Sequence, residues 1–296
     1  MNVIEVSGLT KAYGALTAVD QISFTVEKGT MLGFLGINGA GKSTAINMLS
    51  TLLKPDSGEV TICGHRLGRE DDAIRREIGV VYQQNVLDEL LSVRENLLCR
   101  GQLHGATPAQ ARQTLERLVD LLKLEDILKK RYKFLSGGQK RRCEIAAALM
   151  HTPRILFLDE PTTGLDPATR KDVWQMIRTL RLQEDMTVFL TTHYMEEAAD
   201  ADRIIILDHG RVVAQGTPFQ LKERYAKDKL RLYTEENLAL SGTFTPYGME
   251  LTLDSTLQAL PILEQVKHQI RGFEVIQGDM DDVFLNAVGY ALEESE

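Results

Sequence analysis

The sequence predicts an α/β fold with a mainly parallel sheet, for three reasons. Short apolar runs typical of buried strands alternate with helical stretches, a glycine-rich turn joins the first run to a helix, and one interval between runs is long and helical. The runs cover residues 30–35, 78–82, 154–158, 187–191 and 203–208, and the first helical stretch covers residues 42–53.

Two segments before the first run alternate apolar and polar residues, as half-buried strands do. They cover residues 2–6 and 21–26, and we expect them to form an antiparallel β edge region. A helical insertion is expected at about 85–150. There, Thr107 and Gln110 have the spacing of a capping box, and leucines then recur at helical intervals.

The pattern changes after residue 217, which predicts a main domain at 1–217 and a small C-terminal α+β accessory domain at 218–296. The accessory domain is expected to contain strands at 230–233 and 249–253 and a helix at 260–270. Residues 279–285 have the pattern of an amphipathic helix whose apolar side chains join a core.

Composition excludes several classes of protein. The 296 residues are 43% hydrophobic and 26% charged, values typical of a globular chain rather than of a disordered one. The 34 basic and 42 acidic side chains give a net charge of −8, so nucleic acid is not an expected partner. The three cysteines lie far apart, which argues against a disulfide framework or a zinc site. No signal peptide or membrane-spanning run is found, so we expect any membrane role to come through a partner.

The sequence GINGAGKST, at residues 36–44, satisfies the G-x-x-x-x-G-K-S/T pattern of a phosphate-binding loop. It lies between a strand and a helix, which is the context that this loop requires. Backbone N–H groups would face the β- and γ-phosphates, the lysine would add a charge, and the serine hydroxyl would reach Mg²⁺. The binding residues are then Gly36, Asn38, Gly39, Ala40, Gly41, Lys42, Ser43 and Thr44. A P-loop NTPase core is therefore expected.

Two carboxylates, Asp159 and Glu160, end the apolar run at 154–158. A pair of carboxylates at a strand end is often only solvated, but beside a phosphate-binding loop it favours a Walker B strand. Asp159 would then hold Mg²⁺ through the water shell of the metal. Glu160 would act as general base toward the attacking water.

A second candidate anion site precedes the helical stretch at 140–150. Ser136 can cap that helix, and Gly137 and Gly138, followed by Gln139, expose backbone N–H groups beside it. The residues alone allow two interpretations, a simple helix cap or a second binder of a γ-phosphate.

Taken together, these motifs resemble the nucleotide-binding subunits of ATP-binding cassette (ABC) transporters. The sequence LSGGQ at 135–139 matches the signature motif of that family, and the order phosphate loop, glutamine, signature, Walker B strand, histidine is the family's own. The likeness covers about residues 1–217, and DMDDVFL at 279–285 is similar to the terminal segment of drug, polysaccharide and antibiotic exporter subunits. In this family the signature of one subunit closes over ATP held by another, so the resemblance implies a head-to-tail dimer.

The resemblance also implies roles for further residues. Gln83 would be the Q-loop glutamine, which contacts Mg²⁺ and the attacking water, with the adjacent Gln84 as the other choice. Asp166 would be the D-loop aspartate at the dimer interface, His193 the switch histidine at the γ-phosphate, and Tyr13 the ring that stacks on adenine. The implied catalytic set is Lys42, Gln83, Glu160 and His193, and the implied metal set is Ser43, Gln83 and Asp159.

The function implied is that of an ATPase subunit that uses ATP and Mg²⁺. Closure and reopening of a homodimer would drive export by a separate integral membrane permease, at the cytoplasmic face of the membrane. The alternative is a soluble, non-transport cassette that acts as a nucleotide-dependent clamp or regulator, but relatives that work on ribosomes usually have two phosphate loops. A small-molecule kinase would leave the signature and the switch histidine unexplained.

One local surplus of positive charge interrupts the acidic balance, at residues 129–133 and 140–142. It is either a solvated helix surface or a contact for phosphates of the partner's site, lipid headgroups or, last, nucleic acid.

Overall fold

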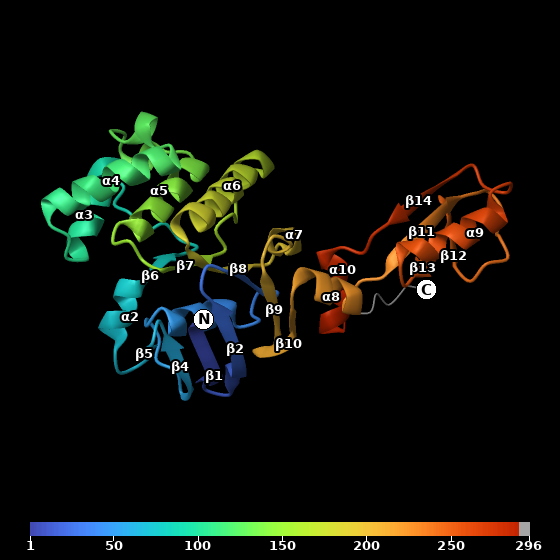
Figure 1. Cartoon of the computed structure of the whole chain (residues 1–296), viewed down its shortest axis with the longest axis horizontal. Helices are drawn as coiled ribbons and strands as arrows, with labels where there is room; N and C mark the ends of the chain where they lie inside the picture. The colour runs from blue at the N-terminus through green and yellow to red at the C-terminus, as the bar shows by residue number, and fades with distance from the viewer. Residues whose placement is uncertain (290–296) are drawn as a thin grey trace.

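The computed structural model describes residues 1–289, which contain three β-sheets (Figure 1). The largest has six strands in the order β10-β9-β3-β8-β7-β6. Its strands are β3 (Met31–Leu35), β6 (Ile78–Val81), β7 (Ile155–Asp159), β8 (Thr187–Thr192), β9 (Arg203–Asp208) and β10 (Arg211–Gly216). All neighbouring pairs are parallel except β9 with β10, so the predicted mainly parallel sheet is confirmed.

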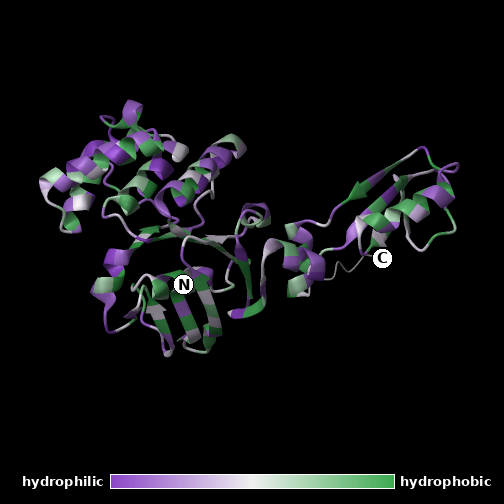
Figure 2. Ribbon diagram, viewed as in Figure 1, coloured by the Kyte–Doolittle hydropathy of each residue, from purple (hydrophilic) through white to green (hydrophobic). Residues whose placement is uncertain are grey.

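The central strands are buried on both faces, which explains why they read as continuous apolar runs in the sequence. Every residue of β3, β7 and β8 is buried. Phe189 packs against Phe34 and Phe157, with ring centroids 5.3 and 5.2 Å apart. Figure 2 shows hydrophilic and hydrophobic residues alternating along the outer helices, as expected of helices that pack one face on a buried layer. This rigid layer fixes the strand ends that carry the candidate site.

The N-terminal strands form a sheet of their own, rather than an edge of the parallel sheet, in the order β2-β1-β4-β5. Its members are β1 (Asn2–Tyr13), β2 (Leu16–Glu27), β4 (Ser57–Ile62) and β5 (His65–Arg66). The predicted antiparallel pairing of the first two strands is confirmed. Helix α1 (Lys42–Leu49) ends four residues before the predicted end at Leu53, because Thr51 has φ of +66°, a left-handed conformation that stops a helix. Helix α2 (Asp71–Glu77) leads into β6.

The predicted helical insertion is confirmed. It contains α3 (Val93–Leu103), α4 (Pro108–Leu122) and α5 (Gly137–Leu149), with short 3₁₀ turns at Glu125–Ile127 and Tyr132–Phe134. The capping box of Thr107 and Gln110 is present at the start of α4. After β7 the chain forms α6 (Pro167–Glu184), and after β8 it forms the short helix α7 (Met195–Ala198). None of the helices within residues 1–289 has the length and hydropathy needed to cross a bilayer.

The C-terminal segment leaves the main body, forms a separate lobe and returns (Figure 1). The lobe is a sheet of order β12-β13-β11-β14 with one helix and a small core of its own. Its elements are β11 (Asp228–Tyr233), β12 (Thr243–Thr245), β13 (Gly248–Leu253), a 3₁₀ turn (Thr256–Gln258), α9 (Ala259–Val266) and β14 (Gly272–Ile276). Helices α8 (Pro218–Tyr225) and α10 (Met280–Val288) lie on either side of it in sequence and pack together. The boundary at residue 217 stays a prediction, because α8 and α10 share the large hydrophobic core of the preceding residues.

The return of α10 to the main body depends on a few apolar side chains. Val283 and Phe284 are buried, as the amphipathic pattern predicts, and α10 contacts α7 and α8. We expect Phe284→Ala to lower the free energy of unfolding by about 3 kcal/mol in urea denaturation. Leu257→Ala, at a side chain that is 72% exposed, serves as the control. An equal loss in both variants would contradict the packing of α10 described here.

Candidate functional site

The phosphate loop joins β3 to α1 and curls around the ammonium group of its own lysine. Lys42 is buried, and its Nζ donates to the carbonyl oxygens of Gly36 at 2.7 Å and Ile37 at 3.1 Å. Gly41 has φ of +102°, and a Cβ at that position would lie 2.2 Å from the carbonyl oxygen of Ala18. Only glycine fits there, so the turn that presents the N-terminus of α1 requires this residue.

The lysine lies close to Asp159 and Glu160, the two carboxylates at the end of β7. Lys42 Nζ lies 3.7 Å from Glu160 Oε1. Burial lowers the pKa of Lys42, while the negative charges of Glu160 and Asp159 act in the opposite direction. The buried cation of Lys42 lies close to the backbone N–H groups at the start of α1. Both would attract the negative charge of a phosphate group.

Glu160 is the centre of the polar site. It follows β7 with φ of +46°, a strained conformation for a residue other than glycine. Its Oε2 accepts from Thr163 Oγ1 at 3.1 Å and from Gln83 Nε2 at 3.4 Å, and Gln83 rather than Gln84 makes this contact. His193 Nδ1 lies 3.2 Å from the same oxygen, but without the alignment of a hydrogen bond. The structure therefore brings together all four residues of the implied catalytic set.

Asp159 lies beside this group and is also buried. Its Oδ1 accepts from Thr191 Oγ1 at 2.6 Å, a contact between the ends of β7 and β8. Burial raises the pKa of Asp159 and the charge of Glu160 raises it further, against the opposing effects of Thr191, Lys42 and Arg141. The environment of Asp159 thus disfavours the charged form of the carboxylate unless a further cation binds nearby.

We expect Asp159→Asn to raise the stability of the nucleotide-free protein. The pKa of Asp159 in the folded protein is raised above its ordinary value, which is the value in the unfolded chain. The free energy of unfolding of the wild-type protein therefore falls as pH rises from the ordinary pKa to the folded-state pKa, and the loss is complete above the folded-state pKa. The neutral amide avoids this loss. Urea denaturation at several pH values should show a higher free energy of unfolding for the variant at neutral pH and a smaller difference in acid. A constant difference at all pH values would contradict this account.

Two buried charged residues on α5 hold the segment around Gln83, and the sequence did not identify them. Arg141 Nη1 donates to the carbonyl oxygen of Tyr82 at 2.8 Å. Glu144 Oε1 accepts from the backbone N–H of Val86 at 3.0 Å and from the hydroxyl of Tyr132 at 2.7 Å. Arg141 and Glu144 are both buried, so Arg141 does not belong to a solvated helix surface, which was one of the two interpretations of the basic residues at 140–142. The signal was present, since these two charges lie three residues apart within a helix that is otherwise apolar toward its end.

The signature lies next to the D-loop. Ser136 caps α5 and forms a capping box with Gln139, so the cap interpretation of this segment is correct whatever else it binds. A Cβ at Gly138 would lie 2.3 Å from Thr169 Cγ2. Asp166 caps α6, accepting from the backbone N–H of Thr169 at 3.1 Å, and hydrogen bonds from Thr169 lower its pKa. Within residues 1–289 no polar contact joins this signature to the phosphate loop, so the two half-sites are separate in one chain.

Tyr13 lies at the end of β1, and 51% of its side-chain surface is exposed. Its hairpin partner strand, β2, reaches the phosphate loop at Ala18. The ring is therefore available to a ligand, and its stacking on adenine stays a prediction.

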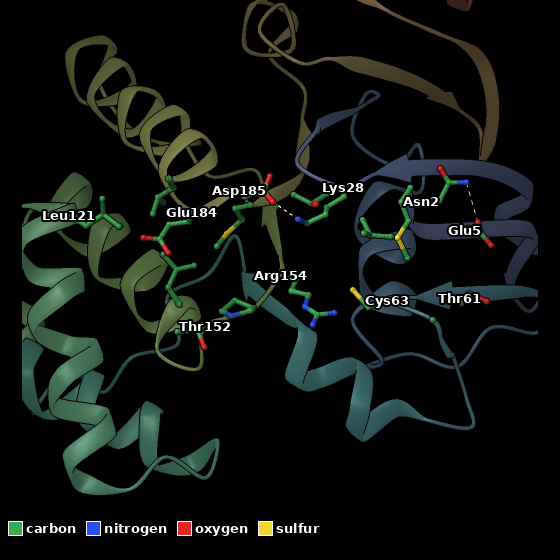
Figure 3. A pocket seen from close by; sticks show the side chains of 18 of the residues that line it. Asn2, Glu5, Lys28, Thr61, Cys63, Leu121, Thr152, Arg154, Glu184 and Asp185 are labelled. Atoms are coloured by element: carbon green, nitrogen blue, oxygen red, sulfur yellow. Dashed lines mark hydrogen bonds and ion pairs between the residues drawn. The ribbon is translucent and has the colours of Figure 1, made fainter.

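A separate pocket of about 630 Å³ lies at the opposite ends of the central strands (Figure 3). Lys28, Arg154 and Thr187, which line it, precede or begin β3, β7 and β8. None of the residues implied in nucleotide binding lines this pocket, so it is not part of the candidate site.

Comparison with known proteins identifies the family. Residues 19–163 match the family model described as ABC transporter. The chain is 39% identical to the daunorubicin/doxorubicin resistance ATP-binding protein DrrA of Streptomyces peucetius, over 98% of this chain and 94% of that protein. It is 37% identical to the Nod factor export ATP-binding protein I of Rhizobium sp. (strain N33), over 98% of each.

A solved structure gives the same result for the fold. A dimeric ATP-binding cassette in a post-hydrolysis state, bound to ADP and Pi, has a TM-score of 0.66 and 30% identity, covering 72% of this chain and 98% of that one. The α/β architecture expected from the sequence is thereby confirmed. The chain belongs to the ABC transporter family, as a subunit that binds and hydrolyses ATP.

Proposed function

We propose that this chain drives export by a separate integral membrane permease, and that it acts at the cytoplasmic face of the membrane as a head-to-tail homodimer. The observation that carries the proposal is the division of the site within one chain. Lys42, Gln83, Asp159, Glu160 and His193 converge, while the signature at 135–139 lies beside the D-loop. A second copy would place its signature over nucleotide held by the first, and closed two-fold symmetry completes two equal sites.

The described residues fit Mg²⁺. Asp159 is a buried carboxylate at a strand end whose pKa is raised by burial, so a cation nearby would relieve its desolvation. Residues 1–289 contain no cluster of three or more His, Cys, Asp or Glu side chains that could hold a metal alone. This agrees with a magnesium ion that takes oxygen ligands from the nucleotide, with Ser43, Asp159 and Gln83 as the protein groups.

Within this site each residue has a proposed role. Lys42 and the backbone of the loop bind the β- and γ-phosphates, and Glu160 accepts a proton from the attacking water. His193 and Gln83, both in contact with Glu160, orient the γ-phosphate and the water. Tyr13 stacks on adenine, and Asp166 contacts the second subunit. Bound Mg²⁺ would neutralise charge on the phosphates.

The proposal that transport is export, not import, rests on the names of the relatives. DrrA of Streptomyces peucetius is named as a resistance ATP-binding protein, and the rhizobial relative as an export ATP-binding protein. Both are matched over nearly their whole length, including the C-terminal lobe.

The test is a pull-down of tagged Glu160→Gln protein, loaded with ATP, from detergent-solubilised membranes of the native cell, with mass spectrometry of the captured proteins. Lys42→Ala under the same conditions is the control, because it should not form the ATP-bound state. We expect a polytopic membrane protein with Glu160→Gln that is depleted with Lys42→Ala. Capture of ribosomal or other soluble partners instead would favour the clamp.

A further inference from the structure

The imidazole of His193 is held by ring packing rather than by hydrogen bonds. Its ring centroid lies 4.1 Å from that of Tyr194, at an interplanar angle of 38°. Within residues 1–289, its Nδ1 has no aligned hydrogen-bond partner, although Glu160 Oε2 lies 3.2 Å away. The direction in which the imidazole points therefore depends on the neighbouring ring.

The ring of Tyr194 is in turn held by Arg170 of α6. The guanidinium carbon of Arg170 lies 4.3 Å from the ring centroid, within the range of a cation–π contact. Arg170 Nε donates to the carbonyl oxygen of Leu165 at 2.9 Å, which anchors the guanidinium to the D-loop. A continuous set of contacts thus joins the D-loop to the imidazole through two side chains.

Other contacts near His193 hold the backbone and do not involve the imidazole ring. The carboxylate of Glu197 accepts from the hydroxyls of Thr162 and Thr192, and Thr192 Oγ1 accepts from the backbone N–H of Tyr194. These bonds place the start of α7 against the loop that follows β7. They do not reach the imidazole ring, whose orientation depends on its tilted contact with the ring of Tyr194.

The D-loop contacts the site at a second point. Thr163 Oγ1, which lies just before the glycine of this loop, donates to Glu160 Oε2 at 3.1 Å. A displacement of residues 163–166 would therefore act on Glu160 through Thr163 and on His193 through Arg170 and Tyr194. This double attachment is what a loop at a dimer interface needs in order to align both groups together.

We propose that Tyr194 and Arg170 are positioning residues for His193, and that through them the D-loop sets the alignment of the imidazole with Glu160 and the γ-phosphate. The proposal rests on the proposed role of His193 in hydrolysis. It assigns no contact with nucleotide to either residue. It requires the aromatic ring of Tyr194 and the cation of Arg170, and it does not require the tyrosine hydroxyl.

The first test measures ATP hydrolysis by the full-length protein. Tyr194→Leu, which removes the ring, should lower kcat about tenfold or more while KM for ATP stays within about twofold, because a misplaced catalytic group costs rate rather than binding. Tyr194→Phe, the matched control, should keep near wild-type kcat. Arg170→Gln should lower kcat about threefold, in line with the loss of one partly exposed cation–π contact.

The second test separates positioning from a general structural effect. In a His193→Ala background, Tyr194→Leu and Arg170→Gln should cause no further loss of kcat, since the group that they position is already absent. Additive losses of kcat in the double variants would overturn the positioning role. The same conclusion would follow if Tyr194→Leu were as active as wild type while His193→Ala hydrolysed ATP slowly. If His193→Ala itself hydrolyses ATP at the wild-type rate, the proposed role of His193 is wrong. Arg170→Gln supplies the same comparison should Tyr194→Leu not fold, as judged by its thermal unfolding.

Discussion

Glu160→Gln is expected to bind ATP with near wild-type affinity and to lose about 10² to 10⁴ in kcat, the usual contribution of a general base. Glu160 contacts four other site residues, Lys42, Gln83, Thr163 and His193. The amide keeps the size of the carboxylate and cannot take a proton from the attacking water. Loss of one negative charge next to bound phosphates should not weaken binding.

The measurement pairs steady-state ATP hydrolysis with equilibrium binding of a fluorescent ATP analogue. Glu184→Gln is the matched control, because this carboxylate lies in the pocket at the opposite ends of the strands. We expect wild-type kcat for Glu184→Gln. Equal hydrolysis by wild type and Glu160→Gln would rule out the general-base role.

Lys42→Ala is expected to weaken ATP binding by about 30-fold or more, because truncation of one partner in a buried charged contact typically costs 2–5 kcal/mol. The Lys42 ammonium already lies within the loop, bonded to the carbonyl oxygens of Gly36 and Ile37. Its removal takes away the charge that would face the phosphates. It also removes the cation that lies 3.7 Å from Glu160 and that favours the charged form of Asp159.

Isothermal titration with ATP and Mg²⁺ checks this expectation. Lys54→Ala, a substitution outside the phosphate loop, should leave the dissociation constant unchanged. An unchanged constant for Lys42→Ala would contradict the proposed phosphate site. A lower free energy of unfolding without a change in affinity would point to a structural role for this lysine instead.

The sequence predicted the parts of the fold that are set by local patterns. Buried strands such as β3 and β7 are nearly continuous apolar runs, and the caps at Thr107 and Ser136 follow from residue spacing alone. The short edge strands β5 and β12 carry no such pattern, and they exist because a neighbouring strand offers hydrogen bonds. The end of α1 is set by the left-handed conformation of Thr51, which a residue other than glycine rarely adopts and which the sequence pattern does not indicate.

In the candidate site, too, some residues could be identified from local sequence patterns and others could not. Motif spacing identified Lys42, Asp159 and Glu160, and the structure places them together. The residues that support them, such as Thr191 and Arg141, contact the site only after strands and helices distant in sequence have packed. Thr191 has no distinctive sequence neighbourhood, and the spacing of Arg141 and Glu144 indicates a buried pair without indicating its partners, so these contacts could be found only in three dimensions.

In the proposed head-to-tail dimer, ATP is hydrolysed between the phosphate loop of one chain and the signature of another. The most direct measurement mixes two variants that are each inactive, Lys42→Ala and Ser136→Arg. Random pairing would give heterodimers with one intact site, so we expect hydrolysis to return to about a quarter of the wild-type rate. A Lys42→Ala/Ser136→Arg double variant mixed with wild type should instead lower the wild-type rate, because its heterodimers have no intact site. Rates that equal the simple sum of the separate proteins in both mixtures would show that each chain hydrolyses ATP alone, and would contradict the account.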